Sequence, residues 1–198
     1  LAYEADFIIP INRIKPHTDF RAKHESGLIK MLAIGVSKHA GATALHFHGM
    51  GNFETLMPEV SKIFLAKTNI LFGIGMVENA NEEMMHIEMI APEDFFDRDA
   101  SLLKMAKESI PQLLFEEIDV LIIDEIGKNI SGAGLDPNVT GRTASKMPGF
   151  DNGLPIGRIV VRDLTEITEG NATGIGVADV TTQRVVRKMD WTKTYLNI

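Results

Sequence analysis

The sequence of 198 residues contains no cysteine. Disulfide bonds, iron–sulfur clusters and thiolate metal sites are therefore excluded, and any metal ligand has to be a histidine, a carboxylate, an amide or a backbone oxygen. The sequence also lacks an apolar run near the roughly 20 residues that a membrane-spanning helix needs, and it shows no signal peptide. We therefore expect a cytoplasmic protein without a membrane partner.

Basic residues are too few to suggest a nucleic-acid partner. The chain has 20 Lys and Arg against 27 Asp and Glu, which gives a formal net charge of -7, and no run of basic residues interrupts this balance. Hydrophobic content of 44% and charged content of 24% are typical of a folded soluble protein. The chain begins at Leu1 and enters an apolar run at once, so we expect a fragment of a longer protein.

Short apolar runs alternate with longer segments of helical periodicity. This alternation predicts an α/β fold, a layered mixed sheet with flanking helices, in which ligands gather beyond the carboxyl ends of the strands. We expect strands at 6–11, 70–77, 86–90, 119–126 and 158–164, and helices at 27–38, 52–67, 97–109 and 181–189. Asn52 is the expected cap of the second helix. Residues 147–155, rich in glycine and proline, are the expected hinge or loop.

Lys30 lies in an apolar segment, between Ile29 and Met31. Burial of a lysine disfavours the ammonium form and lowers its pKa, which leaves the amine free for covalent chemistry. The alternative is a lysine on a partly exposed helix whose ammonium group extends to solvent.

Three further histidines are candidates for chemistry. His17 follows Pro16 directly after an expected strand, and Asp19 lies two residues later. A neutral imidazole oriented by a carboxylate is a plausible general base, although a surface turn histidine is the simpler interpretation. His46 and His48 would face one side and could share a metal if their segment is extended; if it is helical they diverge by about 200°.

The remaining polar groups are less specific. A glycine-rich loop, 127–142, follows the buried strand that ends in Asp124 and Glu125. Backbone N–H groups of such a loop can hold a phosphate, but its spacing does not match a phosphate-binding loop, and a cluster of structural turns is equally consistent. The two carboxylates are either active-site or capping groups. Surface positions without partners are expected for His24, His39 and His86.

Several of these residues have intervals that resemble those of the nickel-pincer lactate racemase family, enzymes that invert 2-hydroxy acids. In that family a Pro-His dipeptide ends a strand, and a glycine-flanked lysine follows. A second glycine lies five residues after the lysine, and a histidine lies sixteen residues after it. The matching residues here are Pro16, His17, Gly27, Lys30, Gly35 and His46.

The resemblance implies a role for each matching residue. Lys30 would be the covalent attachment point of a nickel pincer nucleotide, a thioamide-bearing pyridinium mononucleotide, with Gly35 beside it. His46 would complete the nearly square-planar nickel site, a geometry that suits nickel with a nitrogen ligand. His17 would be one of two histidines that flank the substrate and exchange the hydroxyl proton while a hydride leaves C2 and returns.

The resemblance also divides the chain. Residues 1–68 would be the end of a cofactor-binding domain, and residues 69–198 an α/β C-terminal domain. The Asp136-Pro-Asn138 stretch is similar to a family loop that faces the substrate, which makes Asn138 and Arg142 the substrate-binding candidates.

Some features differ from the lactate enzymes. The interval from His17 to Lys30 is lengthened by the segment 20–26, which would displace His17. The second catalytic histidine and a carboxylate-binding arginine are expected on a preceding segment, a required partner without which this chain would be inactive. We expect a hydroxy acid other than lactate, and a recombinant sample without the cofactor. The alternative function is a non-catalytic nickel- or nucleotide-binding α/β module.

Overall fold

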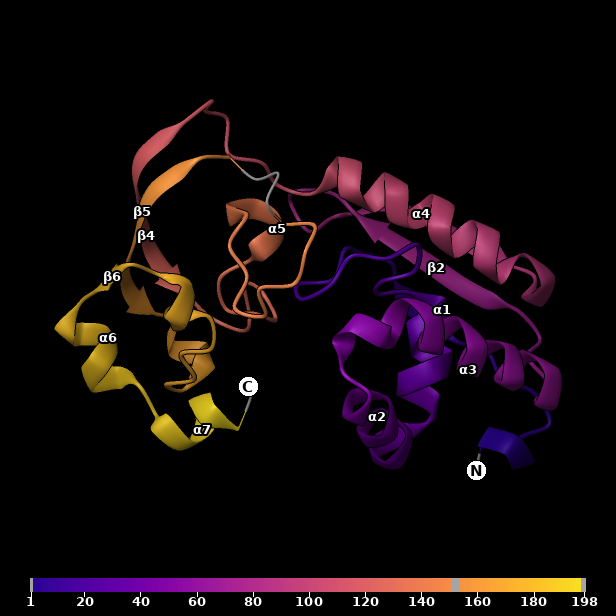
Figure 1. Ribbon diagram of the computed structural model, residues 1–198. Helices are drawn as coiled ribbons and strands as arrows, with labels where there is room; N and C mark the ends of the chain where they lie inside the picture. The colour runs from indigo at the N-terminus through magenta and orange to yellow at the C-terminus, as the bar shows by residue number, and fades with distance from the viewer. Residues whose placement is uncertain (1, 151–153, 197–198) are drawn as a thin grey trace. The chain divides into compact units, whose positions relative to one another are not determined.

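The computed structural model describes residues 2–150 and 154–196. The chain forms two compact units, unit 1 from Leu1 to Pro111 and unit 2 from Gln112 to Ile198, each built around a three-stranded sheet with helices beside it (Figure 1). The predicted α/β class is confirmed. The predicted boundary at residues 68 and 69 falls inside unit 1, because strands on either side of it pair in one sheet.

The sheet of unit 1 is mixed and follows the order β1-β2-β3, with β1 at Ile11–Arg13, β2 at Gly73–Glu78 and β3 at Met84–Ile90. β1 runs parallel to β2, whereas β2 and β3 form an antiparallel hairpin. Burial alternates along β2: Gly73, Gly75 and Val77 are buried, and the residues between and after them are half-buried. One face of the sheet therefore belongs to the core of unit 1.

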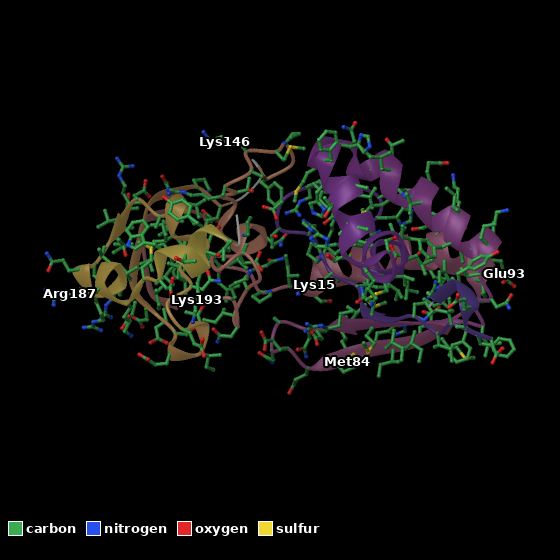
Figure 2. All side chains as sticks on the ribbon, turned by 90° about the horizontal axis from the view of Figure 1, so that it is seen from below. Lys15, Met84, Glu93, Lys146, Arg187 and Lys193 are labelled. Atoms are coloured by element: carbon green, nitrogen blue, oxygen red, sulfur yellow. The ribbon has the colours of Figure 1, made fainter. Side chains whose placement is uncertain are left out.

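Helices cover that face. Gly73 explains how they approach so closely, because a Cβ there would lie 2.7 Å from the Phe95 ring and 2.9 Å from Leu28. Figure 2, in which Met84 on β3 is labelled, shows the helices of unit 1 on one side of its sheet. The helical elements of unit 1 are η1 Ala2–Glu4, α1 Leu28–Lys30, η2 Met31–Val36, α2 Lys38–Phe47, η3 Met50–Asn52, α3 Phe53–Lys67, η4 Pro92–Asp94 and α4 Phe95–Ser109.

The predicted helix at 27–38 is divided in two. α1 makes a single α-helical turn, and η2 continues as a π-helix to Val36. The buried hydroxyl of Ser61, on α3, donates to the carbonyl of Ile29 at 2.8 Å. A side chain that enters the backbone ladder in this way is a known cause of such irregularity. Asn52 is the N-cap residue of α3, as predicted, but its side chain makes no capping bond: the side-chain amide donates to the carbonyl of His48 instead.

Unit 2 has a parallel sheet in the order β4-β5-β6, with β4 at Ile118–Ile126, β5 at Ile156–Leu164 and β6 at Val180–Thr181. Its core gathers buried apolar residues from the two long strands and from α6. The predicted hinge at 147–155 lies partly outside the described residues. The helical elements are α5 Pro137–Thr140, η5 Glu166–Thr168, η6 Ile175–Val177, α6 Gln183–Lys188 and α7 Trp191–Tyr195. Within the described part of the chain, no helix is both long enough and apolar enough to cross a bilayer.

Candidate functional site

A loop, residues 15–26, follows β1, and its two ends lie side by side. Lys15 and Ser26 form an antiparallel bridge, in which each residue's N–H donates to the other's carbonyl at 2.8 and 3.2 Å. Lys15, labelled in Figure 2, marks the base of this loop. The extra segment 20–26 therefore lies within a loop closed at its base, and α1 begins directly after it. Despite the lengthened interval, Lys30 lies close enough to His17 for its charge to lower the pKa of His17.

Glu25 organises the interior of this loop. Its side chain is fully buried, and its Oε2 accepts the backbone N–H of His17 at 2.7 Å. Oε1 accepts from the Ala22 N–H at 3.3 Å and from Lys107 Nζ of α4 at 2.6 Å, while Arg21 lies 3.5 Å from Oε2. A buried carboxylate needs several donors and a counter-charge to offset its desolvation, and Glu25 has both.

A second buried carboxylate, Asp99 on α4, holds the start of α1. Oδ1 accepts from the Leu28 N–H at 2.7 Å and from the Ile29 N–H at 3.4 Å, where the first turn of a helix leaves donors without partners. Oδ2 lies 3.1 Å from Nδ1 of His24, which is 5% exposed. The prediction of a surface position without a partner is wrong for His24, and it is also wrong for the partly buried His86, which pairs with Glu88. His39 is exposed, as predicted.

The ring of His17 is largely enclosed. It packs against Phe20 with ring centroids 4.3 Å apart. Burial is the largest cause, followed by the positive charges of Lys30, Arg21 and protonated His46, and together they lower the pKa of His17 to about 3. The ring is therefore neutral near pH 7.

The orientation of the His17 ring differs from the prediction. Nδ1 accepts the backbone N–H of Asp19 at 3.1 Å, whereas the Asp19 carboxylate lies 3.8 Å away and accepts from Thr18 Oγ1. Because Nδ1 accepts, the neutral ring carries its proton on Nε2. The backbone of Asp19, not its carboxylate, sets this tautomer.

Lys30 is half-buried at the end of α1, with its Nζ 3.4 Å from Ser26 Oγ. Burial lowers the pKa of this amine, the charge of Asp19 opposes the shift, and Lys15 adds to it. A lysine so placed loses its proton more readily than a solvated one, which is the condition for nucleophilic chemistry.

His46 lies near the end of α2 and is exposed. Its Nδ1 lies 2.7 Å from the carbonyl of Ala42, which can only accept, so Nδ1 carries the proton and Nε2 keeps its lone pair. This is the arrangement that orients a histidine for metal binding through Nε2. His48 follows as the C-cap, so the pair is helical and the two rings diverge.

Phe20 and Phe53 connect the two histidines. Their rings meet edge to face with centroids 5.5 Å apart; His17 packs on Phe20, and His46 lies 5.0 Å from Phe53. These ring contacts place His46 near His17, and Lys30 is close enough for its charge to lower the pKa of His17, so unit 1 brings the three together. Among residues 2–150 and 154–196, no group of three or more His, Asp or Glu side chains is arranged to hold a metal ion. A metal at His46 would need most of its donors from a bound cofactor.

The other predicted residues have local structural partners. Gly35 lies in η2, where a Cβ would collide with the sulfur of Met31. In unit 2, Asn138 donates through its backbone and side-chain amides to Asp136, the cap of α5. Arg142 pairs with Asp179 and donates to the carbonyls of Val177 and Ile156. Asp124 is exposed and pairs with Arg162, and Glu125 is also exposed.

The sequence does not reveal the roles of Glu25, Asp99 and His24. The only sequence signal for His24 and Glu25 is a His-Glu dipeptide two residues before the glycine that precedes a helix, a pattern that many surface loops share; Asp99 has no such signal. Comparison with protein-family models, with curated proteins and with solved structures gave no match.

Proposed function

We propose that this chain is part of a nickel-pincer-nucleotide-dependent racemase or epimerase that inverts C2 of a 2-hydroxy acid. The observation that carries the proposal is the placement of His17 and His46 on the paired rings of Phe20 and Phe53, with Lys30 close enough for its charge to lower the pKa of His17. An amine for covalent attachment, an imidazole for a metal and a base for the substrate are the three functions that this reaction asks of one site.

The residues present fit the proposed group. Lys30 supplies an amine whose pKa is lowered by burial. His46 would supply one nitrogen donor to nickel, with Nδ1 held by the carbonyl of Ala42 and Nε2 available, and imidazole is a ligand that suits nickel. When bound, the cofactor supplies an acceptor for the C2 hydride that can return it to either face of the flat keto acid.

His17 is assigned to the hydroxyl proton. Its neutral ring satisfies one requirement of a base, and a substrate carboxylate bound nearby would offset the charges of Lys30 and Arg21 and raise the pKa of His17 toward the useful range. A base acting through Nε2 needs its own proton on Nδ1. The proposal therefore requires a tautomeric shift when substrate binds, with the Asp19 carboxylate, 3.8 Å from Nδ1, as the nearby acceptor.

Incubation of the chain with prepared nickel pincer nucleotide tests the proposal. Peptide mass spectrometry is expected to find the adduct on Lys30, and Lys30→Arg to abolish it. Bound nickel is expected to fall in His46→Ala and to persist in His48→Ala, a matched control two residues along the same helix end.

An unmodified Lys30, or nickel retained equally by both histidine variants, would contradict the assignment. An adduct that forms in a complete protein without any change of chirality at C2, measured by chiral chromatography on a panel of 2-hydroxy acids that includes lactate, would favour a non-catalytic carrier instead.

A further inference from the structure

The only side chain that receives the backbone N–H of His17 among the described residues is that of Glu25, at 2.7 Å. This bond spans eight residues and closes the loop from inside, while the bridge between Lys15 and Ser26 closes it at the base. The two contacts hold the chain on both sides of Pro16, at Lys15 and at His17.

We propose that Glu25 is a positioning residue for His17, holding its backbone so that the imidazole faces Lys30 and His46. This inference rests on the proposed function for its catalytic meaning, although the positioning itself is a property of the folded chain. Glu25 touches neither ring, so its effect on chemistry passes through the His17 backbone.

The donors around Glu25 explain why a carboxylate is needed. Both oxygens face donors only: the N–H of His17 and the Arg21 guanidinium at Oε2, and the N–H of Ala22 and the Lys107 ammonium at Oε1. An ionised carboxylate has acceptors on both oxygens. A glutamine of the same shape would turn its NH₂ group toward one set of donors and lose that set.

Lys107 connects Glu25 to helix α4 of unit 1. It extends from α4 to Oε1, whereas the His17 N–H binds Oε2. Removing the ammonium therefore takes away the counter-charge of the buried Glu25 carboxylate but leaves its bond to the His17 N–H. Lys107→Met is the matched control that separates general destabilisation from positioning.

Amide hydrogen exchange, measured by NMR on the full chain, is the test. In Glu25→Gln the His17 amide proton is expected to exchange about tenfold faster or more, relative to global unfolding, and the ¹⁵N signals of the His17 ring are expected to shift. In Lys107→Met the exchange rate of the His17 amide, corrected for lost stability, and the ¹⁵N signals of the His17 ring should both stay close to those of wild type.

Equal acceleration of His17 exchange in both variants would reduce Glu25 to a structural role and overturn the proposal. So would an unprotected His17 amide in the wild-type chain, a measurement that does not depend on whether Glu25→Gln folds. Adduct formation on Lys30 is followed separately: its failure counts against the proposed function, while altered His17 exchange in Glu25→Gln still supports the positioning role.

Discussion

His17 and His46 carry their neutral-ring protons on opposite nitrogens. His17 accepts a backbone N–H at Nδ1 from Asp19, and His46 donates from Nδ1 to the carbonyl of Ala42. The backbone partner of each ring decides its tautomer. His46 therefore presents a lone pair at Nε2, suited to a metal, and His17 presents an N–H donor until a ligand changes its environment.

The two tautomers are expected to be distinguishable by ¹⁵N NMR of the imidazoles, at a pH where both rings are neutral. His17 should show a protonated Nε2 and His46 a protonated Nδ1. The single-residue variants His17→Gln and His46→Gln assign the signals. Finding the same tautomer in both rings would remove the structural distinction between base and ligand.

Lys30→Met is expected to raise the pKa of His17. Lys30 is the largest of the charges that lower this pKa, and a positive neighbour disfavours the imidazolium. The rise should be partial, because burial, the leading cause, remains. The measurement is an NMR titration of the His17 ring, with the exposed Lys23→Met as control. An unchanged or lower His17 pKa in Lys30→Met would show that the two groups do not interact.

Burial of His17 should make unit 1 less stable in acid. The pKa of His17 is about 3 in the folded chain against an ordinary value of 6.5, so between these values the unfolded chain binds the additional proton. This loss of stability is absent above pH 6.5. It grows as the pH falls toward 3, with a limiting slope of about 1.4 kcal/mol of unfolding free energy per pH unit.

Comparison of wild type with His17→Gln isolates this contribution from carboxylates that titrate in the same range. Glu88, whose hydrogen bond with Arg98 lowers its pKa to about 2, is one of these. The free energy of unfolding in urea, measured across the acid range, should fall more steeply for wild type than for the variant. Parallel curves would mean that His17 is not desolvated.

How far the sequence predicts this protein depends on the range of the interactions. Alternation of apolar residues is local, so the fold class and most elements were predictable. The apolar neighbours of Lys30 likewise indicated that this side chain is buried. The polar network was not predictable, because its partners are distant: Glu25 meets Lys107 across 82 positions, and His24 meets Asp99 across 75. The Ser61 hydroxyl that binds the Ile29 carbonyl just before the π-helix is likewise distant, 32 residues further along the chain.

Asp99→Ala is expected to lower the free energy of unfolding of unit 1 by about 3 kcal/mol, because it removes the N-terminal partner of α1 and leaves His24 buried without its carboxylate. Asp97→Ala, on the same helix with a side chain 91% exposed, should change it by less than about 0.5 kcal/mol. Urea unfolding of both variants measures the difference. Since α1 ends in Lys30, loss of the Asp99 cap should also return the pKa of Lys30 toward that of a solvated lysine. A fully stable Asp99→Ala chain would mean that the packing of Leu28 and Ile29 alone fixes this helix.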